Sequence, residues 1–164
     1  MHQLQTLIPQ LKLLAMASVE QAAAVALGAT VIPKERAVGS TKKSLEATVN
    51  LEVRHDVVNL TVTVGANLRS STAIAARLRE ILPEEVTSER MAEALGEFAT
   101  TVAEQLSAAL EEAGVQTTPN LPVVSMDGKK RRPPSPEALL IVADSCPSEF
   151  SVYVRIDGYW RASG

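Results

Sequence analysis

The chain has 164 residues, enough for one domain with a sizeable apolar core. Its hydrophobic fraction of 46% and charged fraction of 21% are close to the averages of globular proteins, which argues against a disordered chain. The net charge of −3 provides no general attraction to nucleic acid or to acidic membranes. We therefore expect one domain over residues 1–164, with no nucleic-acid partner.

Cysteine and histidine are scarce. A single cysteine, Cys146, excludes an internal disulfide, and it is expected to be an inert loop thiol. His2 and His55 are the only histidines, so no cluster is available for zinc or iron, and a Ser-His-Asp triad is disfavoured. We expect no cofactor of the chain's own.

The N-terminal stretch is rich in leucine and alanine, but polar residues such as Lys12 and Glu20 interrupt it. No uncharged run reaches the ~18 residues that a membrane span needs. No basic cluster precedes an apolar segment, as a secretory signal would require. The sequence predicts a cytoplasmic protein without a membrane span.

The first part of the chain predicts a helix followed by strands. Residues 4–27 repeat apolar side chains at helical spacing, and Gly28 follows where a C′ glycine would end the helix. A short strand is expected at 30–32. Residues 47–53 and 58–64 alternate apolar and polar side chains, which predicts an antiparallel hairpin joined at His55 and Asp56. Residues 36–43 are expected to form an exposed loop.

Two helices are expected next. Ser71 and Thr72 can cap a helix over residues 73–82, which Pro83 would end. A longer helix is expected from Thr87 or Ser88 to about residue 113. Its apolar residues recur at steps of three and four: Met91, Leu95, Phe98, Val102, Leu106, Ala109 and Ala113.

The last third again resembles strands. Short apolar or alternating runs cover residues 121–124, 138–143 and 150–156, and Asp157-Gly158 is expected to turn the chain. The order of elements predicts an α/β (α+β) sandwich, in which a mostly antiparallel sheet is covered by two long helices.

The long helix carries a recognisable motif. Its segment 94–99, ALGEFA, resembles the ALGE(F/I)AN stretch of the CheX-like (CheC/CheX/FliY) chemotaxis phosphatase family. The family pattern is D/S-x-x-x-E-x-x-N, followed later by P-x-V-x-x-G. Glu97 occupies the Glu position, and Pro122, Val124 and Gly128 resemble the later segment, with one extra residue before the glycine. The resemblance implies a CheC-like sandwich.

Two positions depart from this motif within the resemblance, which spans about residues 47–128. Glu93 stands where Asp or Ser is usual, and Thr100 stands at the Asn position. Positions 97 and 100 are i and i+3, so they are neighbours on one helix face. Threonine offers only a short, stiff hydroxyl where asparagine offers a carboxamide.

The resemblance also implies a function in bacterial chemotaxis or related two-component signalling. In the family, this helix enters the active site of a phosphorylated CheY-type receiver, whose lysine the Glu binds while the Asn orients the attacking water. On that pattern Glu97 and Thr100 are the catalytic candidates. The receiver carries the Mg²⁺, and a homodimer is compatible with the resemblance. The candidate partner-binding residues are Glu93, Gly96, Thr101, Glu104 and Pro122.

Other interpretations stay open. Thr100 makes a catalytically weak or inactive binding or dimerisation module the alternative, because its hydroxyl can bond to the Gly96 carbonyl. Thr101 or Glu104 would be the residues to compensate. The glutamates are also compatible with an ordinary solvated helix face. We expect Gly96 to serve close packing of the two long helices rather than approach of a partner, and the basic run 129–132 to be an exposed loop.

Overall fold

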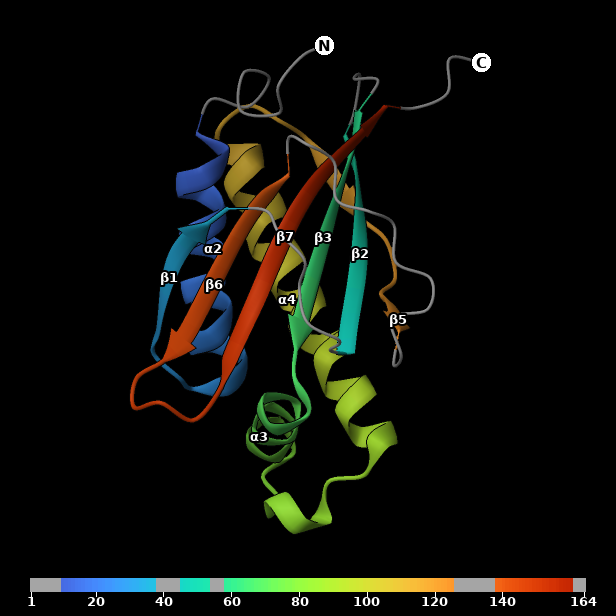
Figure 1. Ribbon diagram of the computed structural model, residues 1–164. Helices are drawn as coiled ribbons and strands as arrows, with labels where there is room; N and C mark the ends of the chain where they lie inside the picture. Colours follow the sequence, from blue (N-terminus) through green and yellow to red (C-terminus); the bar gives the residue numbers. More distant parts are fainter. Residues whose placement is uncertain (1–9, 38–44, 54–57, 126–137, 161–164) are drawn as a thin grey trace.

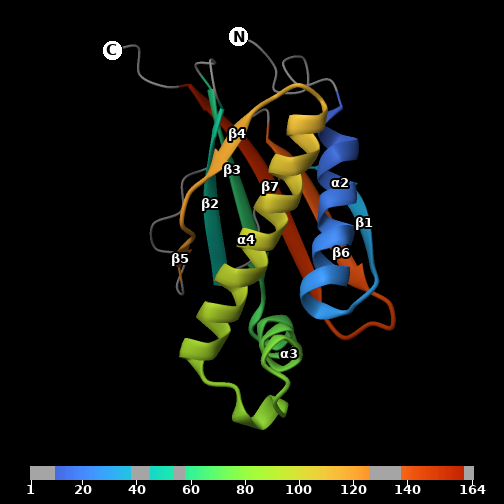
Figure 2. The same cartoon turned by 180° about the vertical axis from the view of Figure 1, so that it is seen from behind.

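The computed structural model describes residues 10–37, 45–53, 58–125 and 138–160. They form two layers, a twisted sheet with helices packed on one of its faces (Figure 1). Helix α2 (Leu11–Ala22), which one further turn extends to Leu27, and the long helix α4 (Ser88–Glu112) run side by side across that face (Figure 2), and α3 (Leu68–Arg79) packs against α4. The predicted α/β sandwich is therefore confirmed.

The sheet has the strand order β1-β6-β7-β3-β2-β4, with β5 also paired to β2. Every strand pairing in the described parts of the chain is antiparallel. The strands are β1 (Val31–Arg36), β2 (Leu45–Val53), β3 (Val58–Ala66), β4 (Thr117–Pro119), β5 (Val123–Ser125), β6 (Leu139–Ser145) and β7 (Ser151–Trp160).

The first helix ends where its sequence predicts. α2 continues into one turn of π-helix, η1 (Ala23–Leu27), and Gly28 closes it in the left-handed conformation with φ of 59°. β1 extends beyond the predicted 30–32, because it pairs with β6 along its whole length. The predicted hairpin is the pair β2 and β3; its connection at His55 and Asp56, and most of the predicted loop 36–43, lie outside the described residues.

The helix after the hairpin has different ends from those predicted. It is capped by Asn67, whose side chain accepts a hydrogen bond from the backbone N–H of Ser70 at 2.8 Å. Ser71 is buried inside the first turn instead, and its hydroxyl donates to the Ala66 carbonyl. The helix ends at Arg79, and Pro83 opens a short 3₁₀ turn, η2 (Pro83–Glu85). α4 agrees with its prediction and is capped by Thr87.

The last third departs from the sequence analysis in two places. β4 has no counterpart in the sequence analysis, because three residues beside β2 are too few to show a periodicity. The predicted turn at Asp157-Gly158 is wrong: β7 runs straight through it. Its neighbour β3 continues to supply strand partners there, Thr61 opposite Asp157 and Leu60 opposite Gly158.

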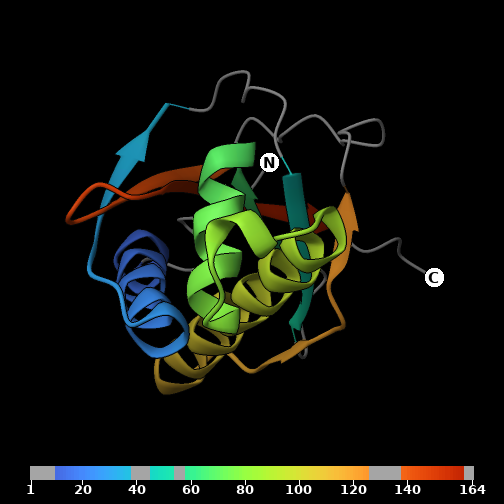
Figure 3. The same cartoon turned by 90° about the horizontal axis from the view of Figure 1, so that it is seen from below.

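The core lies between the helices and the sheet, and Figure 3 shows the helices gathered on one side. Apolar side chains alternate inward along the central strands, and the helices close over them with their apolar stripes. The largest fully buried side chains are Phe98, Leu11, Leu51, Leu60, Ile74, Leu95, Leu106, Leu110, Ile141 and Ile156. This packing fixes α4 on the sheet and leaves Glu93, Glu97 and Glu104 exposed on its other side.

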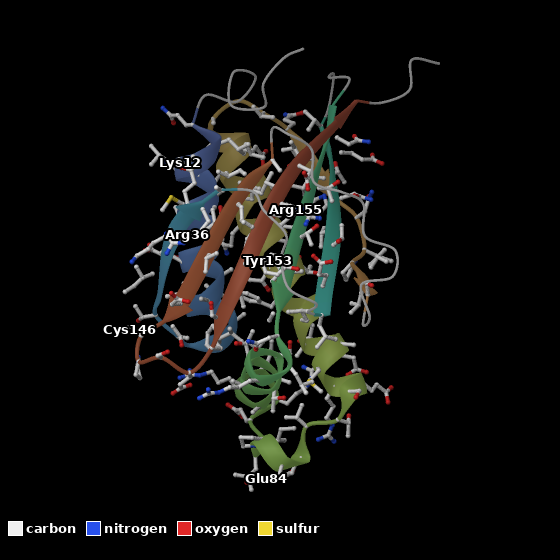
Figure 4. The ribbon with its side chains drawn as sticks, in the orientation of Figure 1. Lys12, Arg36, Glu84, Cys146, Tyr153 and Arg155 are labelled. Atoms are coloured by element: carbon white, nitrogen blue, oxygen red, sulfur yellow. The ribbon has the colours of Figure 1, made fainter. Side chains whose placement is uncertain are left out.

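The face of the sheet turned away from the helices carries a buried polar row. Figure 4 shows Tyr153 and Arg155 on this side of β7. The Tyr153 hydroxyl donates to Glu46 at 2.5 Å, and the Arg155 Nε donates to Asp157 at 2.8 Å. Arg155 Nη1 also lies 3.9 Å from Glu46 Oε2, so the buried charges on this face are paired, as a buried charge requires.

Candidate functional site

The candidate site is the side of α4 opposite its apolar stripe. Phe98, Ala99 and Val102 are buried against the sheet, which turns Glu97 outward as an exposed residue and leaves Thr100 half-buried at the margin. The helical repeat brings positions 97 and 100 onto adjacent turns of one face. The spacing predicted from the motif therefore produces two neighbouring polar side chains.

An open groove of about 510 Å³ runs along this side of α4. All seven residues that the sequence analysis proposed for catalysis or partner binding line it, together with Ala92 and Val124. The seven are Glu93, Gly96, Glu97, Thr100, Thr101, Glu104 and Pro122. The proline lies on the segment leading into β5, so the groove is formed between α4 and that edge of the sheet.

Gly96 allows the β5 edge to approach α4. A Cβ atom at this position would lie 3.3 Å from Val124 Cγ2 and 3.7 Å from Pro122 Cγ. The expectation that Gly96 serves close packing of the two long helices is therefore wrong, because its neighbours come from the β5 segment. The motif glycine and the later Pro-x-Val segment thus meet in space and shape one wall of the groove.

Thr100 is already engaged within its own helix. Its hydroxyl donates to the Gly96 carbonyl at 2.9 Å, as the sequence analysis suggested, and Thr101 donates to the Glu97 carbonyl at 3.0 Å. A hydroxyl that donates in this way keeps its lone pairs, so Thr100 Oγ1 can still accept a hydrogen bond from a molecule in the groove. It has no second N–H or O–H to donate.

Glu97 is held by a residue that the sequence analysis missed. Arg79, the last residue of α3, donates two hydrogen bonds to its carboxylate, from Nη2 to Oε1 at 2.7 Å and from Nη1 to Oε2 at 3.0 Å. The same Nη2 lies 3.7 Å from Oε2 of Glu93. The hydrogen bonds that Arg79 donates to Glu97 raise the pKa of Arg79 above its already high ordinary value, so the guanidinium stays charged. No local signal identifies Arg79, since packing of α3 on α4 brings it there.

The groove is acidic. Three carboxylates line it, from Glu93, Glu97 and Glu104.

Within the described residues, no group of three His, Cys, Asp or Glu side chains is placed to hold a metal ion. No helix in the same residues is long and apolar enough to cross a membrane. Cys146 is exposed between β6 and β7, away from α4 (Figure 4), whereas the basic run 129–132 lies outside the described residues.

Several solved structures have a similar fold, whereas no protein-family model and no curated protein matches the sequence. The chain is similar to the chemotaxis protein CheX of Vibrio vulnificus, with a TM-score of 0.72, 14% identity and coverage of 92% of this chain and 99% of that one. CheX of Desulfovibrio desulfuricans gives a TM-score of 0.70 at 16% identity, again over 92% and 99% of the two chains.

A third similar structure is a complex. CheX of Borrelia burgdorferi, determined together with CheY, BeF₃ and Mg²⁺, covers 92% of this chain and 97% of its own, with a TM-score of 0.68 and 15% identity. These matches confirm the predicted CheC-like sandwich for the chain. At this level of identity they establish the fold.

Proposed function

We propose that the groove along α4 docks a phosphorylated receiver domain of the CheY type and promotes hydrolysis of its aspartyl phosphate. The observation that carries this proposal is the groove itself, which gathers the motif positions of a chemotaxis phosphatase from α4 and from the β5 segment. Its support from other proteins is the shared fold with a CheX that has been determined in complex with CheY.

Glu97 has the charge and exposure needed to bind a receiver lysine. Its carboxylate is half exposed, with 52% of the side chain accessible, even while Arg79 holds it. Each carboxylate oxygen can accept two hydrogen bonds, so a lysine ammonium can join the ion pair without displacing the guanidinium. Glu97 would then fix the register of α4 in the receiver's active site.

Thr100 would act on the attacking water. A water molecule that donates one hydrogen to Oγ1 has a lone pair available for the phosphorus. Its oxygen forms the new P–O bond, the bond between phosphorus and the aspartate oxygen breaks, and the aspartate leaves as a carboxylate. Both hydrogens of the water stay with the phosphoryl group, which is released as dihydrogen phosphate. The Mg²⁺ that neutralises the phosphoryl charge is carried by the receiver, so α4 contributes chiefly position.

The hydrogen bond from Thr100 to Gly96 favours a second candidate function, docking without turnover. An asparagine at this position would accept a hydrogen bond from the water and donate one to the phosphoryl group. The Thr100 hydroxyl already donates its only hydrogen to the Gly96 carbonyl. Loss of one donor to a transition state typically costs about 10²–10³ in rate. A module that binds the phosphorylated receiver and hydrolyses it slowly or not at all is consistent with the same groove.

The decay of an acyl-phosphorylated CheY-type receiver from the same organism distinguishes the two functions. Faster decay with the protein, lost in Glu97→Ala, is the result expected for the phosphatase. Unchanged decay together with binding of the phosphorylated receiver would support docking alone. Absence of both would refute the proposal. Self-association, implied by the sequence resemblance, is a separate proposal that sedimentation over a range of concentrations tests.

A further inference from the structure

Arg79 places a positive charge directly beside the negatively charged residues of the groove. The groove-lining residues include three carboxylates and no cation, while Arg79 stands immediately outside and neutralises part of that charge. The Arg79 side chain is 30% exposed, so a docked partner can still reach it. A partner that meets Glu97 therefore also meets a guanidinium that is hydrogen-bonded to it.

Arg79 retains hydrogen-bonding capacity in this arrangement. A guanidinium carries five N–H groups, and the fork on Glu97 uses one on each terminal nitrogen. Among the described residues, its other acidic neighbour is Glu93, at a longer distance of 3.7 Å. The remaining N–H groups suit a carboxylate or a phosphoryl group, which arginine binds through its planar fork.

A partner with only a cation would be poorly matched to this site. Its positive charge would bind Glu97 but would also lie beside the positive charge of Arg79, and like charges held at such short range repel. A partner that places an anionic group next to its cation satisfies both residues. The pair thus favours one charge pattern and disfavours the other.

We infer that Arg79 is a specificity-determining residue of the groove, selecting a partner that presents an anionic group beside the cation bound by Glu97. The inference rests on the proposed function, in which that partner is the receiver. Its anion is then either the phosphoryl group or a carboxylate of the receiver. Both offer the same chemistry to the guanidinium.

Binding to the receiver, free and loaded with beryllofluoride as a phosphoryl mimic, tests the inference. We expect Arg79→Ala to weaken binding roughly tenfold. Arg79→Lys should recover part of the loss, because it keeps the charge but not the fork. Arg69→Ala is the matched control: Arg69 is an exposed arginine in the first turn of the same helix and, among the described residues, forms no ion pair with Glu93 or Glu97. It should bind within twofold of the unchanged protein.

The outcomes separate this inference from the function on which it rests. A loss confined to the loaded receiver identifies the phosphoryl group as the anion, and a loss with both forms identifies a carboxylate. Binding by Arg79→Ala that equals or exceeds that of the unchanged protein, while Glu97→Ala is weakened, overturns the inference alone. If Glu97→Ala also binds normally, the proposed docking mode itself fails. Equal thermal melting of all variants excludes unfolding as the cause.

Discussion

The two long helices cover the same face of the sheet but have different outer sides. α2 buries Leu11, Ala15 and Val19, whereas Leu13 on its outer side is 68% exposed. α4 buries a similar apolar stripe, but its outer side is flanked by the β5 segment and by Arg79 of α3. An apolar stripe is sufficient to anchor a helix on the sheet, whereas the candidate site also needs further elements placed against the exposed side of the helix.

The largest expected effect tests the anchoring of α4. Phe98 is fully buried, so Phe98→Ala should lower the free energy of unfolding by about 3–5 kcal/mol through lost burial and an unfilled cavity. Urea denaturation measures the change. Leu13→Ala on α2 is the control and should change stability by less than about 0.5 kcal/mol. A small effect of Phe98→Ala would mean that α4 does not depend on this contact.

The corresponding change on α2 should separate stability from binding. Leu11→Ala removes a fully buried side chain and is expected to cost about 2–5 kcal/mol. Because α2 does not line the groove, the folded fraction should bind the receiver as tightly as the unchanged protein. Titration at a temperature where the variant is folded tests this, and weakened binding would show that α2 shares in the site.

Thr100→Asn tests the chemistry of the groove. Asparagine restores a side chain that can accept from water and donate to the phosphoryl group together, so receiver dephosphorylation should become at least about tenfold faster, which is about 1.4 kcal/mol of barrier. Thr100→Val keeps the shape without the hydroxyl and should abolish any activity above the receiver's own decay. No gain from the asparagine, with binding intact, would contradict the positioning role given to this residue.

Gly96→Ala tests how tightly β5 closes on α4. Alanine gains up to about 1 kcal/mol over glycine inside a helix. The new Cβ would lie 3.3 Å from Val124, which sits on a three-residue edge strand and can shift by the few tenths of an ångström required. We expect a net stabilisation below about 1 kcal/mol in urea denaturation. Destabilisation would show that β5 is held rigidly against the helix.

The smallest expected effect concerns Glu149 on the β6–β7 connection. Its partner Arg77 lies on α3 and also contacts the end of η1. Arg77 donates to the Leu27 carbonyl and to the Glu149 carboxylate, and its hydrogen bond lowers the pKa of Glu149. A carboxyl whose folded-state pKa is lowered stabilises the protein above its unfolded pKa of about 4.3 and loses this contribution as the pH falls.

Glu149→Gln should therefore lower the melting temperature slightly at pH 7 and should be indistinguishable from the unchanged protein near pH 3. Thermal melting at the two pH values measures this difference. A difference that persists in acid would assign the effect to packing of the side chain rather than to its charge.

Much of the fold can be predicted from local patterns. The apolar steps of α4, its Thr87 cap and the alternation along β2 and β3 are properties of neighbouring residues, and a buried face requires them. The failures occur where tertiary context overrides a local signal. Asp157-Gly158 has the composition of a turn, but strand partners on β3 keep it extended.

The sequence by itself determined the helix, the spacing of Glu97 and Thr100, and the hydroxyl at the position where the motif has an amide, because these follow from residues within one helical turn. Only the tertiary structure decided that Pro122 and Val124 wall the groove and that Arg79 holds Glu97. These contacts join residues on separate elements, and no periodicity encodes them. They arise because α3, α4 and the β5 edge pack around the same core.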